Sequence, residues 1–308
     1  MVKKYKLLID TDPGVDDALA IMLAHKHADI VGLTIAAGNV GLSHTVANAL
    51  KLIDVIGAET PVFAGCAQPL VLPAADAAFV HGDDGFGDTG YLASTRKAQN
   101  EHAADAILRL SHEHAGELMI ACIAPLTNLA LALRLDPTLP QRIAKLVVMG
   151  GAVTGRGNTH LVPAEFNIGF DPEAAHVVFS SWPNFKLVDW ELTVRHGIDF
   201  DVLDKWLSTG SASAKFYDAI SAKTRAWTVQ RGRPRLMVAD ALALAVALEP
   251  DIVRKSERRH VAIELTGALT RGATVVDWDR RLGHSENAEI VLDLDQSRVE
   301  SLIAGALA

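Results

Sequence analysis

Short apolar runs alternate along the chain with longer segments in which apolar residues recur every three or four positions. The short runs are apolar at nearly every position, which is typical of strands buried on both faces of a parallel sheet. The longer segments have the period of helices that pack on such a sheet. The predicted strands are 5–9, 30–36, 62–64, 118–124, 145–149 and 186–189, and the helices between them are 16–25, 43–56, 101–112, 126–135 and 172–179.

The C-terminal third continues with helices that end at Leu207 and Trp227 and a further helix over 240–248. Alternating segments over 260–265, 274–276 and 289–294 predict strands, and a closing helix begins at Val299. Strands that alternate with helices are typical of an α/β fold with a mostly parallel, Rossmann-like open sheet flanked by helices. Because we find no repeat or linker, we expect one domain over 1–308.

Two segments have no convincing period. The first, 68–100, contains Gly82, Gly85, Gly87 and Gly90, and the second, 150–169, directly follows a predicted strand. Loops of this length inside a compact domain are uncommon and are often functional. We therefore expect both segments to lie over the edge of the sheet where a ligand binds.

The densest polar feature is a group of four aspartates, Asp10, Asp12, Asp16 and Asp17, at the end of the first strand and the start of the first helix. Open parallel sheets bind ligands beyond the carboxyl ends of their strands. A helix cap explains one or two of these carboxylates, but not four. Four carboxylates this close repel one another unless a cation or hydrogen-bond donors compensate them. All-oxygen ligation favours Ca²⁺ or Mg²⁺ over zinc.

Five more polar residues fall where strands should end or where loops should cover the same edge. Each has an ordinary explanation, such as a turn residue, a solvated surface histidine, a helix cap or a loop charge. Their shared location is harder to explain in that way. They are Asn39 in AAGN, His81 in HGDDG, Thr127 in PLTN, and Glu165 with Asn167 in AEFN.

The segments DTDPGVDDALA, AAGN, HGDDG, PLTN, MGG, AEFN and DPEAAHVVF occur in this order, and together they resemble the inosine-uridine-preferring nucleoside hydrolases over essentially the whole chain. The resemblance implies a single nucleoside hydrolase-like α/β domain. It implies calcium-dependent hydrolysis of the N-glycosidic bond of ribonucleosides, which yields free base and ribose. It also implies a homodimer or homotetramer.

The resemblance assigns roles to individual residues. Asp12, Asp17, the main-chain carbonyl of Thr127 and Asp240 would hold Ca²⁺, with Asp10 behind them, and Asp12 would be the general base for a calcium-bound water. Carboxylates near the sugar suit the cationic transition state of glycosidic cleavage. Because dense contacts to ribose penalise a missing hydroxyl, we expect ribonucleosides to be preferred over 2′-deoxyribonucleosides. The implied substrate contacts are Asp16, Asn39, His81, Asn158, Glu165, Asn167, Trp227 and Asp240, with Asp16 and Asn167 towards the 2′ and 3′ positions and Asn158 and Glu165 towards the 5′ position.

The chain departs from many relatives at Ala239, where they carry a histidine that serves the leaving base. His81 and Trp227 are the candidates for this task, although a loop histidine is often solvated and Trp227 could equally be a helix-packing residue. Three arginines in the same segment form either a flap over the base or a solvated loop. These arginines are Arg231, Arg233 and Arg235.

Two other functions compete with this interpretation. Asp10 and Asp12 also match the DxD pattern of haloacid-dehalogenase-type phosphatases, but that hypothesis leaves Asp16, Asp17, PLTN and AEFN unexplained. A nucleoside- or ribose-binding protein that has lost catalysis through Ala239 is the second alternative. A pure binding protein has no need of Asp12 as a base.

Composition adds constraints on partners and location. Apolar residues make up 49% and charged residues 21% of the chain, as in globular proteins, and the formal net charge is −8. Because the basic residues are scattered, we expect neither nucleic acid nor a membrane as a partner. Cys66 and Cys122 cannot build a disulfide framework, and the first residues lack the pattern of a signal peptide. The expected location is therefore the cytoplasm.

Overall fold

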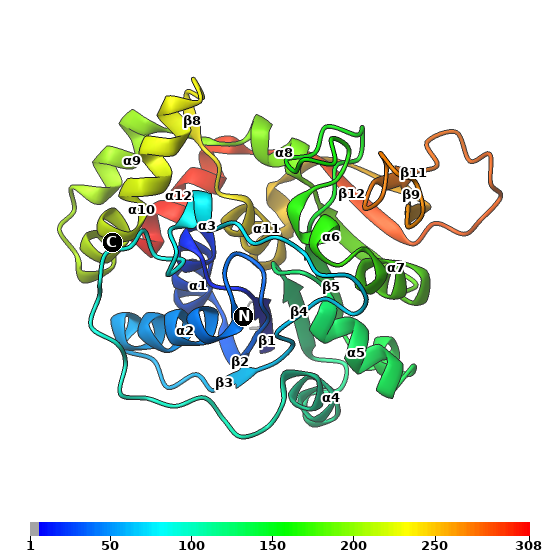
Figure 1. Ribbon diagram of the computed structural model, residues 1–308, viewed down its shortest axis with the longest axis horizontal. Helices are drawn as coiled ribbons and strands as arrows, with labels where there is room; N and C mark the ends of the chain where they lie inside the picture. Colours follow the sequence, from blue (N-terminus) through cyan, green and yellow to red (C-terminus); the bar gives the residue numbers. More distant parts are fainter. Residues whose placement is uncertain (1–5) are drawn as a thin grey trace.

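The computed structural model describes residues 6–308. An eight-stranded sheet lies at its centre, and all neighbouring strands are parallel except the last pair, β12 and β9 (Figure 1). In spatial order the strands are β3 (Val62–Ala64), β2 (Asp29–Ile35), β1 (Lys6–Thr11), β4 (Leu118–Cys122), β5 (Lys145–Met149), β6 (Phe185–Val188), β12 (Ala288–Leu294) and β9 (Val253–Arg259). The mostly parallel sheet predicted from the sequence is confirmed.

The order of the strands reverses at β1. The chain adds β2 and β3 on one side of β1 and then returns to add β4, β5 and β6 on the other side. Asp10 in β1 is in register with Thr34 on one neighbour and with Cys122 on the other. In open α/β sheets, ligands bind in the crevice beyond the carboxyl ends of the strands at such a switch point. The aspartate-rich turn after β1 starts at this crevice.

Helices cover both faces of the sheet, as the 3.6-residue periods predict (Figure 1). Two cores result, one on each face. None of the helices within residues 6–308 is long and apolar enough to span a membrane. The first face carries α1 (Val15–His27), α2 (Leu42–Ile56), α10 (Ala212–Gln230), α11 (Ala239–Leu248) and α12 (Gln296–Ala306), and the second carries α4 (Ala103–Glu113), α5 (Thr127–Leu135) and α7 (Pro172–Ser181).

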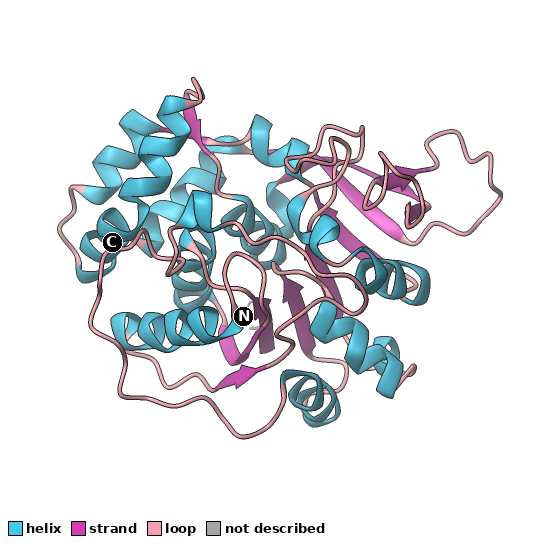
Figure 2. Ribbon diagram, viewed as in Figure 1, coloured by secondary structure: helices cyan, strands magenta, loops and turns pink. Residues whose placement is uncertain are grey.

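Long loops cross the end of the sheet that carries the aspartates (Figure 2). The two segments expected to be irregular contain only one short helix each. These helices are α3 (Ala78–His81) and α6 (Phe166–Phe170). The remaining elements are α8 (Trp190–Arg195), α9 (Phe200–Leu207), the 3₁₀ turns η1 (Leu139–Gln141) and η2 (Pro250–Ile252), and the two-stranded sheets β7 (Ile198–Asp199) with β8 (Arg235–Leu236) and β10 (Val261–Ile263) with β11 (Thr274–Val276).

Some element boundaries and three strands differ from the sequence predictions. The two-residue strands β7 and β8 were not predicted. The strand β9 was not predicted either, because its sequence VRKSERR is mostly charged, and charged residues are typical of a sheet edge. The segment predicted as a strand over 260–265 forms β10 in a separate two-stranded sheet. The helix α10 runs three residues beyond Trp227, and α12 starts at Gln296 instead of Val299. Residue 5 of the first predicted strand lies outside the described residues.

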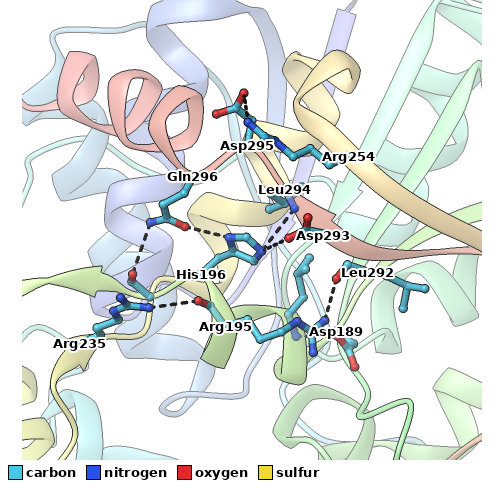
Figure 3. Close-up of polar contacts among 12 residues, drawn as sticks. Asp189, Arg195, His196, Arg235, Arg254, Leu292, Asp293, Leu294, Asp295 and Gln296 are labelled. Carbon is cyan, nitrogen blue, oxygen red and sulfur yellow. Dashed lines mark hydrogen bonds and ion pairs between the residues drawn. The ribbon is translucent and has the colours of Figure 1, made fainter.

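The C-terminal strand and helix are tied to α8 through His196 (Figure 3). The Nδ1 atom of His196 lies 2.8 Å from Oε1 of Gln296, and Nε2 accepts a hydrogen bond from the backbone N–H of Leu294 at 3.3 Å. The Oδ1 atom of Asp293 lies 3.1 Å from Nε2. The imidazole ring thereby fixes the last elements of the chain beside α8.

Candidate functional site

The turn between β1 and α1 places four aspartates within one tight segment. Gly14 caps α1, and its backbone N–H donates to Oδ2 of Asp17 at 2.9 Å, so one of the four does act as a helix cap. A Cβ atom on Gly14 would lie 2.7 Å from Nδ1 of His81, which explains why this position has no side chain. The turn therefore brings His81 against the start of α1.

Asp12 is buried directly after β1. Its Oδ2 atom accepts a hydrogen bond from the backbone N–H of Asn39 at 2.7 Å. The other oxygen, Oδ1, is buried and has no hydrogen-bond partner within residues 6–308. Burial raises the pKa of Asp12 well above its usual range, and the nearby Asp17 raises it further. A buried carboxylate oxygen without a partner indicates that a group from outside the chain, such as a cation or a water, completes the site.

The side-chain amide of Asn39 joins two of the carboxylates. Its Nδ2 atom donates to the main-chain oxygen of Asp12 at 3.1 Å and to Oδ2 of Asp17 at 2.9 Å. The Oδ1 atom of Asp17 accepts from the hydroxyl of Thr11 at 2.6 Å. Asn39 also lines the cavity described below. Its amide hydrogens thus hold the aspartates at the border of the cavity.

Asp240 joins the aspartates from the first turn of α11. Asp16, Asp17 and Asp240 can each offer one carboxylate oxygen such that all three atoms lie within 4.8 Å of one another. Burial raises the pKa of both Asp16 and Asp17 to about 6, and burial together with Asp16 and Asp17 raises that of Asp240 well above its usual range. Like charges in a buried site favour protonation or a bound cation. This cluster could therefore hold a divalent metal ion.

Asp10 and Thr127 are two further residues of the predicted metal site. Asp10 belongs to β1, and Thr127 is the first residue of α5. The Oδ1 atom of Asp10 accepts from Thr34 at 2.7 Å and from Asn128 at 2.9 Å. Burial raises the pKa of Asp10 to about 7, against the effect of these two donors. Thr127 begins α5, and its hydroxyl donates to Oδ2 of Asp171 at 2.7 Å. The side chain of Thr127 thus serves the scaffold, and only its main-chain carbonyl is left for the predicted role.

A cavity of about 380 Å³ lies beside the aspartate cluster. All eight predicted substrate contacts line it, although they come from loops and helices far apart in the sequence. Asp12 and Asp17 are buried and do not appear among its lining residues. The predicted contacts that line it are Asp16, Asn39, His81, Asn158, Glu165, Asn167, Trp227 and Asp240.

Glu165 and Asn167 form a rigid wall of this cavity. The carboxylate of Glu165 accepts from the backbone N–H groups of Asn167, Gly151 and Ile168 at 2.9, 2.9 and 3.2 Å. Burial raises the pKa of Glu165 to about 7, and these three bonds oppose the shift. The Nδ2 atom of Asn167 contacts the main-chain oxygen of Ile123 at 3.2 Å. Both side chains are therefore held in fixed positions at the ends of β4 and β5.

His81 is buried at the end of α3 and accepts a hydrogen bond from the backbone N–H of Val15 through Nδ1 at 3.1 Å. Burial lowers the pKa of His81 to about 4, although Asp17 acts in the opposite direction. The neutral ring therefore carries its hydrogen on Nε2. His81 is not the solvated surface residue that a loop histidine often is.

Aromatic and basic side chains gather at another part of the cavity. Trp227 is half-buried and lines the cavity, and its ring centroid lies 6.1 Å from that of Phe79. The guanidinium of Arg231 lies 4.3 Å from the centroid of Trp227, and that of Arg233 lies between Trp227 and Trp190 at 5.6 and 5.7 Å. Arg231 and Arg233 line the cavity, whereas the third arginine of this segment, Arg235, pairs with Asp199.

The sequence did not single out several residues that line the cavity. Trp190 and Tyr217 are examples, because aromatic residues within helices look like ordinary packing positions. Met149 also lines the cavity. It ends a predicted strand and begins the MGG segment, but no substrate contact was predicted for it. For Tyr217, the helical period places the ring on a buried face but does not show that this face borders a cavity.

Comparisons with known proteins identify the family. Residues 7–301 match the family model described as inosine-uridine preferring nucleoside hydrolase. The pyrimidine-specific ribonucleoside hydrolase RihB of Escherichia coli O1:K1 is 33% identical over 297 residues, which cover 96% of this chain and 94% of that protein.

Solved structures give the same result. An inosine-guanosine nucleoside hydrolase has a TM-score of 0.92 and 33% identity, with 99% of each chain covered. The purine-preferring ribonucleoside hydrolase from Gardnerella vaginalis has a TM-score of 0.90 and 29% identity, with 98% of this chain and 99% of that chain covered. The chain therefore belongs to the family of inosine-uridine preferring nucleoside hydrolases, enzymes that hydrolyse the N-glycosidic bond of nucleosides.

Proposed function

We propose that this protein hydrolyses ribonucleosides to free base and ribose with the help of a bound Ca²⁺. The observation that carries the proposal is the group of three carboxylates, Asp16, Asp17 and Asp240, beside a cavity that all the predicted sugar contacts line. The orphaned Oδ1 of Asp12 next to this group supports the presence of a cation. The family assignment also supports this proposal over the phosphatase hypothesis, which leaves Asp16 and Asp17 without a role.

The ligands for Ca²⁺ would be carboxylate oxygens of Asp12, Asp17 and Asp240 and the main-chain carbonyl of Thr127. All four residues are buried, and oxygen ligands of this kind are those that Ca²⁺ prefers. The ion would supply positive charge that orients the attacking water and the ribose hydroxyls. The hydrogen bonds from Asn39 and Thr11 keep the carboxylates of Asp12 and Asp17 in place before the ion binds.

Asp12 is the proposed general base. As water attacks the anomeric carbon of the sugar, Asp12 accepts one proton from the water, and the bond from this carbon to the base nitrogen breaks. The base leaves with the electron pair of this bond and takes up one proton from solvent water, so that the products are ribose and free base. The sugar passes through a state with positive charge on the ring, which the carboxylates around the cavity stabilise. Burial of Asp12 supports this role, because it strengthens the carboxylate as a base.

The sugar contacts follow from the positions of the polar side chains. Asp16 and Asn167 would bind the 2′ and 3′ hydroxyls, and Glu165 and Asn158 would lie towards the 5′ hydroxyl. Glu165 and Asn167 are fixed by backbone hydrogen bonds, so a sugar without one of its hydroxyls leaves a buried partner unpaired. We therefore propose a preference for ribonucleosides over 2′-deoxyribonucleosides.

His81 and Trp227 are the proposed contacts for the leaving base. The Nδ1 atom of His81 is already used by Val15, so the Nε2–H group is the one that can donate a hydrogen bond to the base. Trp227 offers an aromatic ring at the cavity for stacking. Ala239, where many relatives carry a histidine, lines the cavity beside Asp240 but supplies no donor.

A reducing-sugar assay with inosine, adenosine, guanosine, uridine and cytidine tests the proposal. We expect release of ribose from at least one of them, and we expect the Asp12→Asn variant to lose roughly 10²-fold or more in kcat, as for removal of a general base. The relatives named above differ in their preferred bases, so the panel includes both purines and pyrimidines. Binding of nucleosides without release of sugar would instead support the binding-protein alternative.

A further inference from the structure

Tyr217 stands out among the residues around the cavity because its hydroxyl has no partner. The side chain is fully buried on α10 and lines the cavity. Its hydroxyl oxygen forms no hydrogen bond with any group of the described chain, residues 6–308. Buried polar groups are nearly always hydrogen-bonded, so an exception beside an active site calls for an explanation.

Two carboxylates of the cavity, Asp16 and Asp240, influence the hydroxyl. Burial raises the pKa of Tyr217. Among the nearby charges, Asp16 raises it most, Arg225 acts in the opposite direction, and Asp240 adds a smaller upward effect. Both carboxylates line the same cavity, so the hydroxyl lies at its acidic end. A phenol that keeps its hydrogen beside carboxylates can donate a hydrogen bond to one of them.

Asp16 receives fewer hydrogen bonds from other parts of the chain than its neighbour Asp17 does. Asp17 is held by Thr11, Gly14 and Asn39. The groups that act on the Asp16 carboxylate by hydrogen bonding are the backbone at the start of its own helix and the carboxyl group of Asp240. A donor from another helix would fix the direction in which Asp16 presents its second oxygen.

We propose that Tyr217 is a positioning residue whose hydroxyl donates to Asp16 when substrate binds, and that it thereby sets the discrimination between ribose and 2′-deoxyribose. The inference rests on the proposed function, in which Asp16 contacts the 2′ and 3′ hydroxyls. Arg225 does not compete for the hydrogen of Tyr217, because a guanidinium offers only donors and this one pairs with Asp218 and Asp204.

The helix α10 also contributes a residue to the other end of the cavity. Trp227 lies ten residues beyond Tyr217, which corresponds to about 15 Å along a helix. Tyr217 therefore serves the acidic, sugar-binding end, and Trp227 with Arg231 lies at the other end, where the base would sit.

The test compares Tyr217→Phe with Tyr91→Phe as the matched control. Tyr91 also carries a hydroxyl, which donates to Asn48, and this residue does not line the cavity. Because the Tyr217 hydroxyl has no partner in the free protein, its removal leaves the Tm unchanged or raises it, whereas Tyr91→Phe leaves Asn48 unpaired and lowers the Tm. A purely structural role for Tyr217 predicts a lower Tm and no change in sugar discrimination.

The decisive readout is the ratio of kcat/KM for uridine and 2′-deoxyuridine, or for the corresponding purine pair. We expect Tyr217→Phe to lower this ratio about tenfold and Tyr91→Phe to leave it unchanged, since a misaligned Asp16 discriminates less against a missing hydroxyl. A ratio within about twofold of the wild type would overturn the inference. A parallel loss of Ca²⁺ affinity in Tyr217→Phe would also overturn it, because the hydroxyl would then act on the cation site.

A second measurement distinguishes a failure of this inference from a failure of the proposed function. If the wild type released no sugar from any ribonucleoside, calorimetry on the Ca²⁺-loaded protein would measure the preference for ribose as the ratio of the binding constants for D-ribose and 2-deoxy-D-ribose. A tenfold smaller preference for ribose in Tyr217→Phe would then support the positioning role, at about the size expected for a lost sugar contact. An unchanged preference would refute it.

Discussion

His81 accepts a hydrogen bond at Nδ1 from the backbone N–H of Val15, 3.1 Å away, and this bond fixes which ring nitrogen can serve a substrate. The neutral ring carries its hydrogen on Nε2, and burial keeps the pKa of His81 at about 4. At neutral pH, His81 is therefore a hydrogen-bond donor and not a positively charged acid.

This geometry predicts the pH dependence of turnover. An imidazolium acid loses its proton as the pH rises through its pKa, so an enzyme that depends on it loses activity above that pH. With a pKa of about 4, His81 is already neutral at pH 6. We therefore expect the wild type and His81→Ala to show the same dependence of kcat on pH between pH 6 and pH 8. His81→Ala should nevertheless lower kcat, by roughly tenfold or more, because the donor is lost. A tenfold fall of kcat per pH unit between pH 6 and pH 8 that is seen in the wild type but not in His81→Ala would contradict the neutral donor role.

The close contact between Gly38 and Asp12 gives a second prediction. A Cβ atom on Gly38 would lie 2.1 Å from Oδ2 of Asp12 and 2.9 Å from the ring of Pro125. Gly38→Ala must displace the proposed base, and we expect a loss of kcat of roughly 10²-fold, as for a displacement of about 1 Å.

Gly41 provides the matched control for this variant. A Cβ atom at Gly41 has no neighbour within 4 Å, and its backbone angles, φ −61° and ψ 151°, suit any residue. Gly41→Ala should keep kcat within about twofold of the wild type, as surface substitutions away from special features usually do. Equal losses in the two variants would show that the contact with Asp12 is unimportant.

The cation site should bind Ca²⁺ more weakly as the pH falls. In the metal-free protein burial raises the pKa of Asp17 to about 6 and also raises the pKa values of Asp12 and Asp240, so protons compete with the cation for these proposed ligands as the pH falls, and binding releases protons. Calorimetry should show a lower affinity at pH 5.5 than at pH 7.5, with proton release that is larger at pH 6 than at pH 8. The same affinity at both pH values would mean that these carboxylates are not the ligands.

His196 tests the stability of the C-terminal elements independently of the active site. Replacing this buried ring by alanine leaves the buried backbone N–H of Leu294 without its partner, which should cost about 1–3 kcal/mol, and also removes the contact with Oε1 of the half-buried Gln296. Arg254→Ala removes an exposed ion pair with Asp295 in the same region (Figure 3) and should hardly change the Tm. Equal changes in Tm would show that the ring of His196 has no special role.

The sequence predicted most of the sheet, because parallel strands such as β1 and β5 are continuous apolar runs. It did not predict β9, since a charged edge strand resembles a loop. The candidate site could be predicted where polar residues interrupt apolar runs, as at Asp12 and Asn39. Tyr217 could not be predicted, because its ring looks like core until the structure shows a hydroxyl without a partner.

Ca²⁺-dependent hydrolysis can be measured through the amounts of free base and ribose released from uridine and inosine in the presence of Ca²⁺, after chelation and after Ca²⁺ is restored. We expect equal molar amounts of base and ribose from at least one of these nucleosides, loss of both products on chelation, and recovery with Ca²⁺. Undiminished release from the metal-free protein, or no release from either nucleoside by the Ca²⁺-loaded protein, would contradict the proposed Ca²⁺-dependent hydrolysis.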